Sequence, residues 1–155
     1  VALGKGFPGG EYPASRLLLR APLDVLPQFG ALVTNGQEEI AALAYLITMR
    51  WAEANAPVVR EIGDRYEARM RELAERHPRL IAGITSQRHL LGIEFRDLAG
   101  ARACVARLNE LGLDISAQTY KADCPPVVLT KLPLTADRAV IAFVVDAMRE
   151  AVAQP

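Results

Sequence analysis

The residue best placed to do chemistry is Lys5, which lies between glycines in the opening stretch VALGKGFPGGEYPAS. Gly4 and Gly6 leave the lysine amine uncrowded, and glycines adopt backbone angles that other residues avoid. A lysine whose pKa is depressed by burial or by a nearby cation can attack an aldehyde and form a Schiff base. The same pattern is typical of a solvated lysine in an ordinary loop, so Lys5 alone leaves both interpretations open.

Cysteine and metal chemistry have little support in the sequence. Cys104 and Cys124 are too few and too widely spaced for a disulfide framework or a zinc site. We therefore expect buried or incidental thiols, no bound metal and a reducing cytoplasm.

The composition indicates a globular domain without a large charge bias. The chain has 155 residues, of which 51% are hydrophobic and 23% charged, and 18 Lys and Arg balance 18 Asp and Glu. Nothing suggests a nucleic-acid partner or an acidic membrane surface. The apolar runs are shorter than the roughly 20 residues that a membrane-spanning helix needs. We expect a cytoplasmic protein.

Hydrophobic periodicity divides the chain into three parts. Residues 1–34 are rich in glycine and proline and read as a loop followed by an extended arm with one short strand. Residues 35–78 read as two helices, the first capped by Asn35 and the second beginning at Pro57. Residues 79–155 read as a compact α+β domain.

The last part alternates strands and helices in an α+β order. Residues 80–97 predict an antiparallel strand pair, and residues 98–112 a helix. Further strands are expected at 113–119 and 127–132, followed by a helix capped by Thr135. The buried side of this helix is expected to carry Val140, Ile141, Val144, Met148 and Val152. The predicted fold is a small, mostly antiparallel sheet covered on one face by helices.

Five segments in the right order resemble the class III pyridoxal-phosphate aminotransferases, and together they cover essentially the whole chain. They are LGKGFPGGEYPAS, FGALVTNGQEEIAALAYL, NAPVVREIGDRYEARMRELAERHP, SQRHLLGIEFRD and VVLTKLPLTADRAVIAFVVDAM. The first resembles the segment that carries the family's cofactor lysine, with Lys5 in the lysine position. The resemblance implies fold type I, with residues 1–34 closing the large cofactor-binding domain and residues 79–155 forming the small C-terminal domain.

The resemblance also implies an activity. Lys5 would form the internal aldimine with pyridoxal 5'-phosphate and shuttle a proton, while the cofactor ring acts as electron sink. Thr34, at the start of a helix, would bind the cofactor phosphate, although capping that helix explains it equally well. The reaction would move an amino group from a small-molecule amine donor to a keto or aldehyde acceptor, in a homodimer whose subunits share their sites.

The sequence departs from the family at several positions. Many members place an arginine before the final proline-leucine turn to clamp the substrate carboxylate, whereas this chain has Lys131 near that position, which supplies only a point charge. His89 replaces a family glycine and is expected at an active-site entrance or in solvent. Glu94 is expected to pair with Arg88.

The resemblance further implies that this chain is the C-terminal portion of such an enzyme, because residues that complete the family's cofactor site are missing from it. The portion alone is expected to be inactive. Two alternatives stay open at this point. One is an amino-acid epimerase or aminomutase on the same fold, and the other is a non-catalytic α+β interaction module.

Overall fold

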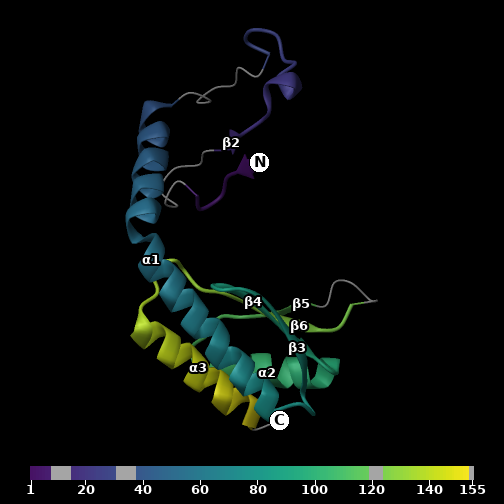
Figure 1. The fold of residues 1–155 in the computed structure, drawn as a ribbon. Coiled ribbons are helices and arrows are strands. Elements are labelled where there is room, and N and C mark those ends of the chain that lie inside the picture. Colours follow the sequence, from purple (N-terminus) through teal and green to yellow (C-terminus); the bar gives the residue numbers. More distant parts are fainter. Residues whose placement is uncertain (8–14, 31–37, 119–123, 154–155) are drawn as a thin grey trace. The chain divides into compact units, whose positions relative to one another are not determined.

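The computed structural model describes residues 1–7, 15–30, 38–118 and 124–153 (Figure 1). The chain divides into two compact units, Val1–Ala56 and Pro57–Pro155. The three-part division at residues 34/35 and 78/79 stays a prediction.

The first unit contains a small ladder of two short strands. Strand β1 (Ala2–Leu3) pairs antiparallel with β2 (Arg16–Leu17), so that Ala2 faces Leu17 and Leu3 faces Arg16. The terminal amino group of Val1 donates to the Leu18 carbonyl at 2.7 Å, and the Leu18 N–H donates back to the Val1 carbonyl at 2.8 Å. A short 3-10 helix, η1 (Ala21–Leu23), follows. The strand expected near residues 16–19 is therefore present.

Helix α1 (Glu39–Arg76) is continuous, although the sequence predicted two helices over this range. Pro57 lies inside it and does not begin a second helix. A proline in a helix removes one hydrogen bond and costs about 3 kcal/mol. The residues from Pro57 onward recover that cost by packing, because four apolar side chains one or two turns apart are buried: Ile62, Tyr66, Met70 and Leu73. The predicted end before His77 and Pro78 is confirmed.

A four-stranded antiparallel sheet forms the centre of the second unit, in the order β3-β4-β6-β5. Its strands are β3 (Ile81–Gln87), β4 (Leu90–Phe95), β5 (Ala117–Gln118) and β6 (Val127–Lys131). Strands β3 and β4 form a tight hairpin because Gln87 pairs with Leu90, which leaves only Arg88 and His89 in the turn. Strand β5 pairs with β6 over two residues only.

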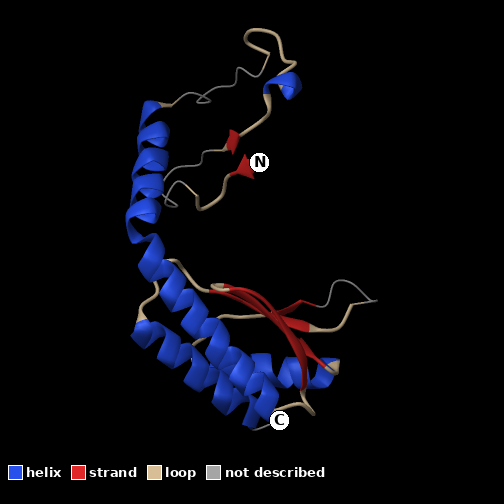
Figure 2. Ribbon diagram, in the orientation of Figure 1, coloured by secondary structure: helices blue, strands red, loops and turns tan. Residues whose placement is uncertain are grey.

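Helices cover one face of this sheet, as Figure 2 shows for α2 (Leu98–Glu110) and α3 (Arg138–Ala153). Alternation along β4 directs Leu91, Ile93 and Phe95 toward the helices, and all three are fully buried. They join side chains of α1, α2 and α3 in one hydrophobic core. The predicted α+β fold with a mostly antiparallel sheet is confirmed.

Helix α3 begins later than the sequence suggested. The Asp137 carboxylate accepts a hydrogen bond from the Val140 N–H at 2.9 Å, so Asp137 caps this helix where Thr135 was expected. A carboxylate so close to the helix start also interacts favourably with the helix dipole. Ile141, Val144, Met148 and Val152 are buried as predicted, whereas Val140 is exposed.

Candidate functional site

Lys5 occupies a tight turn that closes directly after β1. The Phe7 N–H donates to the Gly4 carbonyl at 3.1 Å, which makes Lys5 the second residue of a four-residue turn. The φ of Lys5 is 54°, in the left-handed region that non-glycine residues avoid. The glycines on either side do not take this angle; the lysine takes it itself. Strained backbone of this kind costs about 1–3 kcal/mol and clusters at functional sites.

Aromatic and cationic contacts hold the Lys5 turn onto helix α1. The ring of Phe7 lies 5.1 Å from the ring of Tyr45, and the Arg16 guanidinium lies 5.2 Å from the centre of the same ring. Such contacts are worth roughly 0.5–1.5 kcal/mol each. Tyr45 is 6% exposed and anchors both the turn and β2 to the helix.

The surroundings of Lys5 fit an amine that meets a carbonyl compound. Its side chain is exposed, and a Cβ added at Gly6 would meet none of the described residues within 4 Å, so no described side chain crowds the lysine. Among the described residues, no carboxylate pairs with the Lys5 amine. A flat aldehyde could therefore reach this nitrogen without displacing an existing partner, and the residues present fit pyridoxal phosphate in this respect.

Thr34 and Lys131 are the other two predicted site residues. Thr34 falls outside the described residues, so its assignment to the cofactor phosphate stays a prediction. Lys131 ends strand β6 in the second unit and is exposed. Lys5 belongs to the first unit and Lys131 to the second.

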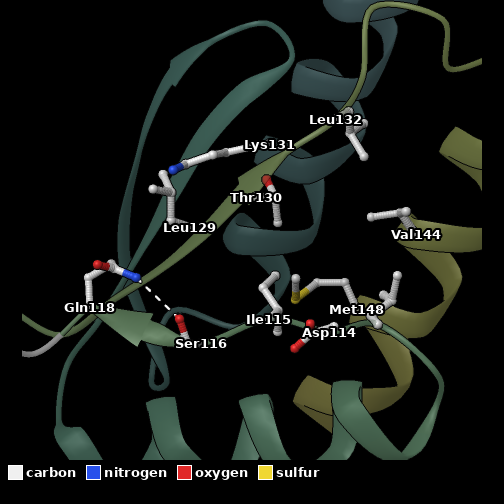
Figure 3. A pocket seen from close by; sticks show the side chains of 11 residues that line it. Asp114, Ile115, Ser116, Gln118, Leu129, Thr130, Lys131, Leu132, Val144 and Met148 are labelled. Carbon is white, nitrogen blue, oxygen red and sulfur yellow. Dashed lines mark hydrogen bonds between the residues drawn. The ribbon is translucent and has the colours of Figure 1, made fainter. Parts of the chain in front are cut away.

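Lys131 lines a cavity of about 300 Å³ between β6, α3 and the segment that leads into β5. Figure 3 shows the side chains of Lys131 and Leu129 on one side of β6 and that of Thr130 on the other. The apolar part of the wall includes Leu129, Leu132, Val144 and Met148. The polar part includes Ser116 and Gln118, which share a hydrogen bond of 3.3 Å. No pattern in the sequence indicated this cavity, since its wall comes from three separate elements.

A buried hydrogen-bond chain ties the cavity wall to helix α1. The Tyr66 hydroxyl donates to Thr130 Oγ1 at 2.8 Å, and Thr130 Oγ1 donates to the Leu91 carbonyl at 3.2 Å. Tyr66 is fully buried, and burial raises the pKa of its phenol to about 12 although the bond to Thr130 opposes the shift. This phenol therefore stays neutral at physiological pH and serves as a structural donor.

Helix α1 and the β3–β4 hairpin also meet through a cluster of charged residues. The Glu67 carboxylate accepts hydrogen bonds from Arg71, from the Ser86 hydroxyl and from the Arg88 N–H. The bonds from Arg71 and Ser86 lower the pKa of Glu67 most. Arg88 pairs with Asp64 at 2.6 Å. Every carboxylate of the cluster has a protein partner, which favours a structural role.

Glu94 does not pair with Arg88, which corrects the sequence interpretation. Its carboxylate accepts a hydrogen bond from the Thr85 hydroxyl at 3.0 Å. Arg88 lies in the hairpin turn, and its side chain is directed to Asp64 of helix α1. Arg88 lies in the turn of the hairpin, whereas Glu94 lies toward the other end, where it pairs in register with Gly83.

His89 is buried, whereas an active-site entrance or solvent was expected. The residue is 7% exposed, and its Nε2 has no hydrogen-bond partner among the described residues. A Cβ added at Gly63 would lie 2.8 Å from His89 Nδ1, so the ring packs directly against the helix backbone. Burial lowers the pKa of His89, and the charge of Arg88 lowers it further. In the sequence, the feature that indicates this close approach is Gly63, a glycine inside a helical pattern.

The described part of the chain contains no group of three or more His, Cys, Asp or Glu side chains arranged for a metal ion. Cys104 is buried and lies 3.8 Å from the Met148 sulfur, and burial raises the pKa of its thiol to about 12. Cys124 is exposed and unpaired. Among the described helices, none has the length and apolarity to cross a membrane.

Comparison with known proteins gives a result at the level of structure only. No protein-family model matches the sequence, and no curated protein sequence matches it. Solved structures do match. An aminotransferase from Bacillus anthracis superposes with a TM-score of 0.78 at 18% identity, over 99% of this chain and 38% of that chain.

Two further solved structures give similar values. The ornithine delta-aminotransferase of Plasmodium falciparum matches with a TM-score of 0.79 at 21% identity, over 98% of this chain and 39% of its own. The acetylornithine aminotransferase of Elizabethkingia anophelis matches with a TM-score of 0.73 at 19% identity, over 99% of this chain and 38% of its own. The expected resemblance is therefore confirmed in the fold. The chain spans about two fifths of the length of these aminotransferases.

Proposed function

We propose that this chain is part of a class III pyridoxal-phosphate-dependent aminotransferase and that Lys5 is its cofactor lysine. The observation that carries the proposal is the Lys5 turn, in which a strained backbone presents an exposed amine that pairs with none of the described residues. The likeness of almost the whole chain to solved aminotransferases supports it. The transfer of an amino group from a small amine to a keto or aldehyde acceptor would belong to the whole protein.

Each residue of the Lys5 turn has a task in this proposal. Lys5 Nζ would hold the aldehyde carbon of the cofactor and, when released from it, carry a proton. The hydrogen bond between Phe7 and Gly4 fixes the lysine backbone, and the contact of Phe7 with Tyr45 fixes the turn on helix α1. Bound pyridoxal phosphate supplies an electron sink for the substrate's α-carbon. Thr34 is proposed to bind the cofactor phosphate.

Exposed apolar side chains in the first unit support the proposed homodimer. Seven large apolar residues between Leu17 and Phe29 are 48–80% exposed: Leu17, Leu18, Leu19, Leu23, Val25, Leu26 and Phe29. A dense group of this kind is unusual on a monomer and typical of a surface that another chain covers. We propose that the partner is a second copy of the same protein.

Chemical trapping tests the assignment of Lys5. The 155-residue chain is incubated with one equivalent of pyridoxal phosphate, reduced with borohydride and mapped by peptide mass spectrometry. Lys5, Lys121 and Lys131 are the three lysines of the chain, so the adducts are easily assigned. We expect the phosphopyridoxyl group mainly on Lys5. Equal labelling of the three lysines, in a protein shown to be folded, would overturn the assignment.

Two variants sharpen the trapping experiment. Lys5→Arg keeps the charge but cannot form the reducible adduct, so labelling at its peptide should vanish while the weak labelling of Lys131 persists. Thr34→Ala should reduce the preference of Lys5 for pyridoxal phosphate over pyridoxal, if Thr34 holds the phosphate. An unchanged preference would remove Thr34 from the proposed site and leave Lys5 in place.

A further inference from the structure

The tip of the β3–β4 hairpin, formed by Arg88 and His89, is packed onto the backbone of helix α1. A Cβ built at Gly63 would lie 2.6 Å from the Arg88 Cβ, and 2.8 Å and 2.9 Å from Nδ1 and Cε1 of His89. Any side chain larger than hydrogen at position 63 would therefore push the tip away from the helix. Gly63 provides the space that the hairpin tip occupies, although glycine is a poor helix former.

The imidazole of His89 is buried in this contact without a partner for its Nε2. The residue is 7% exposed, and none of the described residues forms a hydrogen bond with the buried Nε2. A neutral ring can stay in this position, because only one polar nitrogen is left unsatisfied. An imidazolium has two N–H donors and a positive charge, and burying such a group without a partner is far more costly.

The charged residues of the neighbouring elements offer no free counter-charge to a protonated His89. Arg88, which precedes it in the turn, is itself a cation. Each acidic residue within four positions of Gly63 on α1 already has an arginine partner: Glu61 with Arg138, Asp64 with Arg88, and Glu67 with Arg71. The other charged neighbours are also cations: Arg60 and Arg65 of α1, and Lys131 of β6.

Protonation of His89 is therefore coupled to its exposure. Burial lowers the pKa of His89 below its ordinary value of 6.5, and the charge of Arg88 lowers it further. A ring released into water regains the ordinary pKa, so the open state binds the proton first as the pH falls. The closed state is fully favoured above pH 6.5. It loses up to about tenfold against the open state per pH unit below that value, until the pH reaches the lowered pKa of the closed state.

We propose that His89 is an acid-sensitive latch: the neutral ring holds the hairpin tip on helix α1, and the protonated ring leaves the helix so that the tip opens. Opening would release the Leu132 N–H, which donates to the His89 carbonyl at 2.9 Å, and the Glu67 carboxylate, which accepts from the Arg88 N–H. The latch belongs to the second unit and goes beyond the proposed function, since it operates whether or not Lys5 holds a cofactor.

Amide hydrogen exchange measures the opening of the tip. Protection of the Leu132 N–H, relative to an unstructured peptide at the same pH, is followed by NMR in the 155-residue chain from pH 7.5 to 5.5. This window stays above the range of Glu67, whose pKa is lowered by its bonds from Arg71 and Ser86. The Phe95 N–H, which donates to the Pro126 carbonyl at the far end of β4, is the internal reference.

We expect the protection of Leu132 to fall several-fold over this window, by at most about tenfold, and that of Phe95 to stay constant. Constant protection at Leu132 would overturn the proposal. An equal fall at both amides would overturn it as well, because acid would then destabilise the whole unit and not the hairpin tip.

Side chains that do not titrate separate the effect of the proton from that of packing. His89→Phe keeps a ring, and His89→Gln keeps a polar group without the ring. In both variants the protection of Leu132 should be independent of pH, whatever its absolute value. His77→Gln removes the only other histidine of the chain and should keep the full pH dependence. A pH dependence that survives in either variant of His89, or that disappears in His77→Gln, would contradict the assignment.

Gly63→Ala should open the latch without acid. The added methyl group would overlap the His89 ring, so Leu132 should be poorly protected already at pH 7.5. Lowering the pH should then change its protection by less than about twofold, since the ring is exposed from the start. Alanine is the better helix former, so this loss could not come from a weaker α1. Protection and pH dependence equal to those of the parent chain would show that the ring does not depend on Gly63, which would overturn the latch.

Discussion

Lys5 and Arg88 share an unusual backbone angle for different reasons. Both are non-glycine residues with positive φ, 54° at Lys5 and 59° at Arg88. At Arg88 the geometry of the sheet explains the angle, because a two-residue hairpin whose turn matches the strand twist needs positive φ at its first central position. At Lys5 the strand pairing places no such demand, since Leu3 pairs with Arg16. The strain at Lys5 is therefore the better indicator of function.

Replacing Arg88 measures the backbone strain in the hairpin. Arg88→Gly and Arg88→Ala both lose the exposed ion pair with Asp64, which is worth at most about 1 kcal/mol. Only glycine relieves the positive φ, so Arg88→Gly should be more stable than Arg88→Ala by about 1 kcal/mol. Urea unfolding of the two variants gives this difference directly.

Arg102 provides the matched control for the Arg88 comparison. It lies exposed inside helix α2, where glycine is less favourable than alanine by about 1 kcal/mol. The order of stability should therefore reverse, with Arg102→Ala above Arg102→Gly. The same order at both positions would mean that the strain at Arg88 does not contribute to stability.

At the scale of elements, Tyr66 and Thr130 join helix α1 to strand β6. The Tyr66 hydroxyl depends on Thr130 as its acceptor, whereas Thr130 retains the Leu91 carbonyl as its own acceptor if Tyr66 is removed. Removing one partner of a buried hydrogen bond is costly when the other is left unsatisfied. The two substitutions are therefore not equivalent, although they break the same bond.

Thr130→Val should destabilise the protein more than Tyr66→Phe. The first leaves a fully buried hydroxyl without an acceptor and should cost about 2 kcal/mol, while the second should cost about 1 kcal/mol. The double variant should lose less unfolding free energy than the two single variants lose in sum, because it leaves no orphaned hydroxyl. Additive effects in a urea-denaturation cycle would show that the two hydroxyls are not coupled.

The sequence predicted the elements of the sheet better than their ends and contacts. Alternation and turn signals were enough for the β3–β4 hairpin and for β6, because these depend on residues close in the sequence. The division of α1 at Pro57 was wrong, since burial of Ile62, Tyr66 and Met70 outweighs the local cost of the proline. Local propensity carries no information about such packing.

The same limit applies to the candidate site, where local patterns were visible in the sequence and contacts between distant segments were not. Glycines around Lys5 were visible in the sequence, but the positive φ of the lysine itself was not, because it depends on how the turn closes. The burial of His89 depends on Gly63, which is 26 positions earlier and in another element. The cavity at Lys131 depends on where β5 stops pairing, which no single segment determines.

At the scale of the whole molecule, two buried acidic groups set the stability at high pH. Tyr66 and Cys104 lie in the core of the second unit, and burial raises the pKa of each to about 12. In the unfolded chain their ordinary pKa values are 10.0 and 9.0. The two groups contribute fully to the free energy of unfolding at pH values below these unfolded pKa values. It falls as the pH rises, because the unfolded chain releases the protons first, and it is lost at the folded pKa of about 12.

The free energy of unfolding should therefore decline from about pH 9 upward, by a few kcal/mol before pH 12. Cys104→Ala removes the earlier part of the decline, and Tyr66→Phe removes the part that begins near pH 10. Urea midpoints measured from pH 8 to 11 would separate the two contributions. Substitution of the exposed Cys124 by alanine should leave the profile unchanged. A decline that persists unaltered in Cys104→Ala would mean that the buried thiol does not control it.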